Sequence, residues 1–304
     1  MKSKKNILIT GGGGFLGKRL TLSLAKKGHK VFTIVRSFPK KKDIHFFNSY
    51  DVEIIKCDLE KIDLKKLPKK IDTLFTLAQS SNFREFPQKA EEVFSVNVTA
   101  NLKLLQWAIT NGVQQVIHAS SGGIYGGKSG EIFSEDDLLA VDNPLGFYLS
   151  GKLCSEIIFQ NYMHYFETAV ILRPFFIYGP DQKKDMFIPR LIQSIQKETP
   201  IFLQGKVGLK VNPIFVDDVT IMFQNSLSLK GKHIINIAGP DILNLKKLSK
   251  IIGNKFGKMP VFEYKNGKVV DFVGNIEQGI KKLNHPLTSF ELGIEKTIFN
   301  TKKI

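Results

Sequence analysis

The sequence predicts an α/β fold, in which a doubly wound parallel sheet is joined by a smaller, discontinuous C-terminal lobe. Through the first half of the chain, short apolar runs typical of strands buried on both faces alternate with segments of helical spacing. Repeated strand–helix–strand order makes a parallel sheet with helices on both faces. After Pro174 the regular alternation of strands and helices ends, because further prolines divide the chain into shorter segments.

The expected elements follow one another along the chain. The apolar run 6–10 (NILIT) is the first strand, and the leucines after the next glycine run predict a helix over 15–28. Further strands are expected at 31–35, 52–56, 73–78, 116–119 and 169–172, and further helices at 91–111, 153–165 and 188–197. Residues 1–174 should form the large domain, to which 211–240 returns, and residues 175–210 and 241–304 the smaller lobe.

Composition narrows the class of protein. Of 304 residues, 42% are hydrophobic and 24% charged, as in soluble globular proteins, and no apolar run approaches the roughly 20 residues of a membrane-spanning helix. The net charge of +16 comes mostly from lysines spread along the chain, without a recognisable nucleic-acid-binding module. Two distant cysteines and six scattered histidines predict neither a disulfide nor a metal site. A reduced, cytoplasmic setting is expected, with no membrane or nucleic-acid partner.

A glycine-rich turn joins the first strand to the first helix. Gly11, Gly14 and Gly17 are spaced three apart: the first permits a tight turn, the second lets the backbone approach a pyrophosphate, and the third allows close packing of helix on strand. The helix N-terminus, at Phe15 and Leu16, offers N–H groups and a partial positive charge to phosphates. Such turns also use glycine without any ligand, but the β-α-β context predicts a Rossmann-like dinucleotide-binding domain.

The end of the second strand is the position at which such a domain reads the ribose. NAD enzymes usually place an acid there, whereas this strand ends in Val35, Arg36 and Ser37. Arg36 could pair with a 2′-phosphate, or it is only an exposed arginine, and NADP(H) is therefore expected in preference to NAD(H). Past the third strand, Asp58 could accept a hydrogen bond from the adenine amino group, and Leu59 could cover the adenine ring. Carboxylates are also common in turns, so Asp58 alone does not decide this.

A tyrosine and a lysine stand four residues apart on one helix face, at Tyr148 and Lys152. An adjacent lysine cation favours the phenolate, so the tyrosine could exchange protons near neutral pH. The loop 120–126, rich in serine and glycine, follows a predicted strand at the edge where parallel sheets bind ligands. A hydroxyl there could stabilise developing charge on a substrate oxygen, although each pattern alone occurs by chance.

In combination, these motifs resemble the extended short-chain dehydrogenases, the family named for NAD-dependent epimerases and dehydratases, which act mostly on nucleotide sugars. The resemblance covers roughly residues 5 to 240. The matching motifs are the glycine turn, Ser-Ser-x-x-Ile-Tyr-Gly at 120–126, Tyr-x-x-x-Lys at 148–152, Arg-Pro-Phe-Phe-Ile-Tyr-Gly-Pro at 173–180, Asn97 with its neighbours, and Val-Asp-Asp-Val at 216–219.

The resemblance implies roles for individual residues. Ser121, Tyr148 and Lys152 would be the catalytic group; Tyr148 and Lys152 would also contact the coenzyme. Leu77 and Ala78 would line the coenzyme, and Pro174 would lie near the nicotinamide. Many members dimerise through a four-helix bundle that includes the Tyr-x-x-x-Lys helix, so a homodimer is expected.

The chain departs from the family pattern at several positions. Dehydratases carry Asp-Glu where this sequence has Gly122 and Gly123, so water elimination lacks its usual acid and base. Many members that act on sugar nucleotides have asparagine at the position of Phe176, where it helps to bind the diphosphate. The arginine often found before the Val-Asp-Asp segment is missing, since Val211 and Asn212 occupy that stretch.

The expected function is therefore hydride transfer at a ring carbon of a nucleotide sugar, by a 4-epimerase or a ketosugar reductase. An NADPH-dependent reductase of a non-nucleotide carbonyl compound is the alternative, which Phe176 and Val211 favour. The intact catalytic group argues against a regulator without catalysis. Candidates to meet the diphosphate in place of the missing residues are Lys183, Lys184, Arg190 and Lys210.

Overall fold

A computed structural model describes residues 4–37, 47–140 and 146–299. Two compact units are present, and each is described by itself. The first unit comprises residues 1–124, 141–173 and 220–235, and the second comprises residues 125–140, 174–219 and 236–304. The assignment of a coenzyme to the large predicted domain and of a substrate to the lobe stays a prediction.

Within the described residues, seven strands form the main sheet, in the order β11-β6-β5-β4-β1-β2-β3. The strand pairs from β6 to β3 are parallel, which confirms the predicted fold class. The order reverses at β1, which lies between β2 and β4. The strands are β1 (Asn6–Thr10), β2 (Lys30–Val35), β3 (Val52–Lys56), β4 (Thr73–Thr76), β5 (Gln115–Ala119), β6 (Thr168–Pro174) and β11 (Gly231–Ile237).

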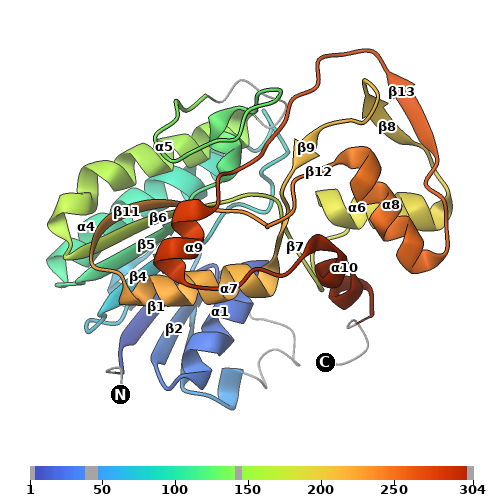
Figure 1. The fold of residues 1–304 in the computed structure, drawn as a ribbon. Coiled ribbons are helices and arrows are strands. Elements are labelled where there is room, and N and C mark those ends of the chain that lie inside the picture. The colour runs from blue at the N-terminus through green and yellow to red at the C-terminus, as the bar shows by residue number, and fades with distance from the viewer. Residues whose placement is uncertain (1–3, 38–46, 141–145, 300–304) are drawn as a thin grey trace. The chain divides into compact units, whose positions relative to one another are not determined.

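Helices cover both faces of this sheet, with α4 and α5 on one side and α1 on the other (Figure 1). The predicted helix 91–111 is divided, because a π-helical turn, η2, interrupts it. The helix that was predicted to begin at residue 153 begins at Gly146 in the structure, so it contains both Tyr148 and Lys152. The helices are α1 (Phe15–Lys26), α3 (Ala90–Phe94), η2 (Ser95–Thr99), α4 (Ala100–Thr110), α5 (Gly146–Tyr162) and α7 (Val216–Asn225).

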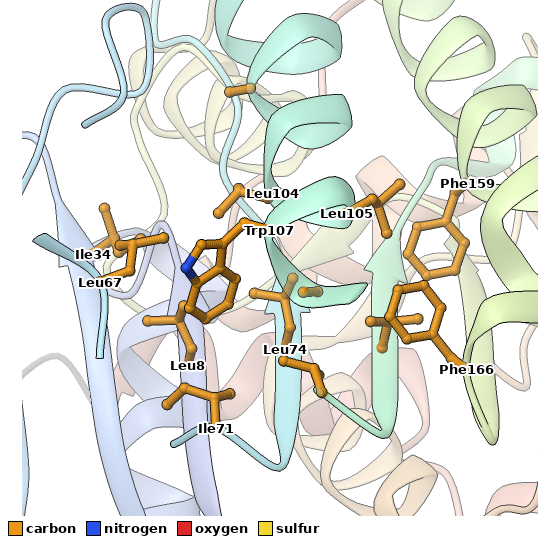
Figure 2. Close-up of a cluster of buried hydrophobic side chains, with 14 of the residues drawn as sticks. Leu8, Ile34, Leu67, Ile71, Leu74, Leu104, Leu105, Trp107, Phe159 and Phe166 are labelled. Carbon is orange, nitrogen blue, oxygen red and sulfur yellow. The ribbon is translucent and has the colours of Figure 1, made fainter. Parts of the chain in front are cut away.

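The core of the first unit lies between α4, α5 and the sheet. Figure 2 shows Trp107 of α4 beside Leu8 and Leu74, which come from the neighbouring strands β1 and β4. Their side chains are almost completely buried; each fully buried residue of this size stabilises the fold by about 1.5–3 kcal/mol. Phe159 of α5 belongs to the same cluster, so the helix with Tyr148 and Lys152 is packed firmly.

The second unit has small sheets and its own core. Leu191, Leu248 and Phe290 meet there from three helices. Its strands pair as β7 (Ile177–Tyr178) with β10 (Ile214–Phe215), β9 (Lys210–Val211) with β12 (Leu243–Asn244), and β8 (Ile201–Gln204) with β13 (Phe262–Lys265). Its helices are α6 (Phe187–Lys197), α8 (Leu245–Phe256), α9 (Glu277–Leu283) and α10 (Phe290–Phe299). Across the described part of the chain, none of the helices has the length and apolar character to cross a bilayer.

Candidate active site

The glycine turn between β1 and α1 has the geometry predicted for it. Gly11 has φ 72°, the left-handed region that favours glycine. A Cβ on Gly17 would lie 2.2 Å from the Gly11 carbonyl oxygen, so this position cannot hold a side chain without moving the turn. Gly14 caps α1 without a side-chain hydrogen bond, and the first helical turn has no acidic residue. The N–H groups at Phe15 and Leu16 therefore face no competing carboxylate on their own helix.

The segment after β4 lies directly against this turn. The N–H groups of Leu77 and Ala78 both donate to Thr10 Oγ1, at 3.1 Å each, and a Cβ on Gly11 would lie 2.9 Å from the Ala78 Cα. Gly-rich backbone, a helix N-terminus without a side-chain cap and a small residue at 78 fit a dinucleotide pyrophosphate. The roles of these residues as coenzyme ligands stay predictions.

The predicted adenosine residues lie at two strand ends. Arg36, just after β2, is largely exposed, and its guanidinium donates to Ser81 Oγ at 3.0 Å and lies 3.7 Å from a carboxylate oxygen of Glu92. Asp58 is exposed after β3 and accepts the Glu60 N–H at 3.0 Å. Leu59 is buried in the core of the first unit. The acid beside Arg36 was not expected from the sequence, because it comes from α3.

Ser121, Tyr148 and Lys152 come together at the C-terminal end of β5. Ser121 Oγ accepts the Gly123 N–H at 3.1 Å, inside the short helical turn that follows the strand. The Tyr148 hydroxyl forms a hydrogen bond with Ser121 and donates to Gln79 Oε1 at 3.2 Å. Lys152 Nζ donates to the Ala119 carbonyl at 2.8 Å. The arrangement can hold a substrate oxygen between a hydroxyl and a phenol that exchanges a proton.

Burial dominates the proton affinities of the pair on α5. It raises the pKa of the Tyr148 phenol to about 12, although the hydrogen bond with Ser121 acts in the opposite direction. Burial also lowers the pKa of the Lys152 ammonium to about 8, against the attraction of Glu156. The spacing alone predicts a lowering of the tyrosine pKa by the lysine, whereas burial raises that pKa here. Tyr148 carries its proton at neutral pH.

Lys152 should give the protein a recognisable pH dependence of stability. Its usual pKa of 10.5 applies to the unfolded chain, which thus binds the proton more tightly than the folded state with a pKa of about 8. The free energy of unfolding should therefore rise between pH 8 and 10.5, and Lys152→Met should abolish this rise. Urea unfolding at several pH values measures it. Lys250 is exposed, so Lys250→Met is the control and should keep the rise. If the free energy of unfolding changes with pH in the same way in wild type and Lys152→Met, the lowered pKa of Lys152 is contradicted.

A buried ion pair anchors the same helix one turn further on. Arg173, at the end of β6, binds Glu156 through Nη2 at 2.6 Å and Nε at 3.1 Å. Both side chains are almost wholly inaccessible to solvent, at 2% and 0% exposure. Glu156 also accepts from Gln160 at 3.1 Å. Sequence reasoning missed Glu156, although its spacing of four from Lys152 placed it on the same buried face.

His118 is a core residue. Its ring nitrogens lie 2.8 Å from Thr76 Oγ1 and 3.4 Å from Ser155 Oγ, and its ring stacks on Phe159. Burial, together with the charge of Lys152, holds its pKa well below the usual range. No group of metal-ligating side chains occurs in residues 4–37, 47–140 and 146–299.

In the second unit, the departures from the family pattern have structural roles. Phe176 has φ 42°, strained for a bulky residue, and its ring packs edge-on against Phe187 and Phe272. The Asn212 amide is bonded on both sides to Gly274, at 2.8 and 3.0 Å. The basic candidates for the diphosphate are all exposed, and their role stays a prediction; they are Lys183, Lys184, Arg190 and Lys210.

Comparison with known proteins extends these observations. A family model, the NAD-dependent epimerase/dehydratase family, matches residues 7–238. The dTDP-4-dehydro-6-deoxyglucose reductase of Escherichia coli is 27% identical over 323 residues, covering 98% of either chain. The UDP-glucuronate 4-epimerase of Thermodesulfobacterium geofontis is 28% identical, covering 96% of this chain and 94% of that protein.

A similar fold occurs in the solved structure of MoeE5 in complex with UDP-glucuronic acid and NAD. The TM-score is 0.83 at 26% sequence identity, with 98% of this chain and 99% of that chain covered. Likeness over nearly the full length, together with the family match and the glycine, serine and Tyr-x-x-x-Lys motifs, supports one conclusion. This chain belongs to the NAD-dependent epimerase/dehydratase family.

Proposed function

We propose that this protein moves a hydride between a nicotinamide coenzyme and a ring carbon of a nucleotide sugar, as a 4-epimerase or a ketosugar reductase. The observation that carries this proposal is the convergence of Ser121, Tyr148 and Lys152 at the end of β5, in the same unit as the glycine turn. The relatives are named as a 4-epimerase and a reductase of sugar nucleotides, which supports this class of substrate.

Each residue of the catalytic group has a distinct task. The coenzyme, when bound, accepts or returns the hydride. Tyr148 exchanges a proton with the reacting oxygen, and because its phenol is protonated at neutral pH, it is ready to act as an acid when a carbonyl is reduced. Ser121 donates to the same oxygen and stabilises the charge that develops on it. Lys152, anchored to the Ala119 carbonyl, adds positive charge beneath the site.

Water elimination is not part of the proposal. Gly122 and Gly123 supply no acid or base after the catalytic hydroxyl. A Cβ on Gly123 would lie 2.7 Å from Leu149 Cδ2, so a larger residue at 123 would need the side chain next to Tyr148 to move.

The coenzyme of the proposed reaction is NAD(H). The family is NAD-dependent, and MoeE5 was solved with NAD. The preference for NADP(H) predicted from Arg36 finds no support in these comparisons. The structure supplies a physical reason, since Glu92 lies beside the Arg36 guanidinium and offsets its charge.

A homodimer is proposed as the assembly, as the family resemblance implies. Ile109 of α4 and Tyr165, which follows α5, are exposed, and together with Tyr162 they line a shallow hollow of about 460 Å³. Exposed apolar side chains that line one hollow favour association. A cytoplasmic location stays a prediction.

Binding of nucleoside diphosphates tests the substrate class. We expect at least one of UDP, dTDP, GDP and CDP to bind below millimolar concentration in calorimetric titration with NAD⁺ present, because both base and diphosphate of a nucleotide sugar are retained. Inorganic pyrophosphate is the control for phosphate binding alone and should bind more weakly. If none of the four binds and small uncharged ketones are reduced instead, the protein is a reductase of a non-nucleotide carbonyl compound. The packing of Phe176 against Phe187 and the hydrogen bonding of the Asn212 amide to Gly274 favour that alternative.

A further inference from the structure

Arg36 and Glu92 meet from different parts of the first unit. Arg36 follows β2, where dinucleotide-binding domains read the adenosine ribose, and Glu92 lies in α3. The closest guanidinium and carboxylate atoms are 3.7 Å apart, and Arg36 Nη2 also donates to Ser81 Oγ. The cation that would attract a 2′-phosphate is thus already beside an anion.

Glu92 is held in place by hydrogen bonds from the segment that follows β4. Its Oε1 accepts from the Ser80 hydroxyl at 2.8 Å and its Oε2 from the Asn82 amide at 2.9 Å, and its side chain is only 15% exposed, against 60% for Arg36. The hydrogen bond from Ser80 is the largest influence, and it lowers the pKa of the carboxyl. Glu92 is therefore a fixed anion at neutral pH, and Arg36 is the more exposed partner.

This arrangement discriminates between the two coenzymes by charge. A 2′-phosphate brought to Arg36 would approach a fixed carboxylate, and like charges a few ångströms apart repel. A ribose 2′-hydroxyl meets no such repulsion, and it can donate to a carboxylate. NAD enzymes usually place an acid at the end of the second strand. Here the residue at that position is Arg36, and the acid is Glu92 of α3, which lies beside the arginine.

We propose that Glu92 is a specificity-determining residue that makes the adenosine ribose site selective for NAD(H) over NADP(H) by neutralising Arg36 and repelling a 2′-phosphate. The inference rests on the proposed function, in that it requires a coenzyme at the glycine turn.

Glu92→Gln removes the charge and keeps the shape of the side chain. Titration of NADH and NADPH, followed by nicotinamide fluorescence, measures dissociation constants without any substrate. The ratio of NADPH to NADH affinity should rise roughly tenfold or more, the scale of a single partly screened charge. Glu91→Gln changes a neighbouring exposed acid of the same helix and should leave the ratio within about twofold.

Arg36→Gln, alone and combined with Glu92→Gln, completes a double-mutant cycle for this pair. By itself it should lower the ratio, because the Glu92 carboxylate is then left without its cationic partner and repels a 2′-phosphate more strongly, and in the double variant the ratio should return close to that of wild type. An unchanged ratio in Glu92→Gln overturns the proposal, as does a gain that persists without Arg36. If Glu92→Gln does not fold, binding of NADPH by wild type as tight as that of NADH overturns it independently. Failure of wild type to bind either coenzyme would instead overturn the proposed function, and this inference with it.

Discussion

Tyr148→Phe is expected to lower turnover about 10²-fold or more, the usual scale for a general acid–base group, while coenzyme affinity and fold are retained. The substitution removes the hydroxyl that meets Ser121 and Gln79 but keeps the ring and its contact with Phe83. Proton transfer to the reacting oxygen is then lost. Single-turnover kinetics on the substrate found by nucleotide titration give the effect on the chemical step, and fluorescence titration gives coenzyme affinity.

Tyr162→Phe is the matched control, since this tyrosine lies on the same helix. Its hydroxyl is only a distant partner of Gln106, at 3.5 Å, so turnover should remain near that of wild type. Near wild-type turnover in Tyr148→Phe would remove the residue from the catalytic group. An equal loss in both variants would point to disturbance of α5 rather than to chemistry.

Glu156→Leu is expected to destabilise the protein by about 3–5 kcal/mol, because the Arg173 guanidinium loses its buried carboxylate partner. The double substitution Glu156→Leu/Arg173→Met should recover most of the loss, since replacing a whole buried ion pair by apolar residues is often neutral or stabilising. Urea unfolding measures both free energies, and the difference between the single and double variants gives the coupling.

Two outcomes would contradict the role of this pair. One is a cost below about 1 kcal/mol in the single variant, the range of an exposed pair. The other is a double variant no more stable than the single one, which would mean that the loss comes from packing at α5. The double variant also removes the attraction that raises the pKa of Lys152, so it should be less active even where it folds well.

The sequence by itself determined the features that depend on local spacing. Buried strands appear as apolar runs, so β1 to β6 and the parallel sheet could be predicted. The glycine turn also follows from neighbouring residues, because Gly11 needs a positive φ and Gly17 leaves no room for a Cβ. The spacing of four between Tyr148 and Lys152 places both on one face of any helix that contains them.

Only the tertiary structure decided the features that depend on distant residues. The predicted helix 91–111 is interrupted at η2, where Asn97 accepts the Ser80 N–H and Asn101 donates to the Asn97 carbonyl. The edge strand β11 was not expected as a separate element, because its place beside β6 comes from chain return rather than local pattern.

The electrostatics of the site were likewise beyond local reasoning. The spacing of Tyr148 and Lys152 suggested a lowered tyrosine pKa, but desolvation reverses that direction, and burial is a property of everything packed around a group. Arg36 suggested NADP(H) because its sequence neighbours include no acid, whereas folding brings Glu92 to it from α3. Sequence spacing specifies which side chains share an element, and only the packed fold specifies which charges share a site.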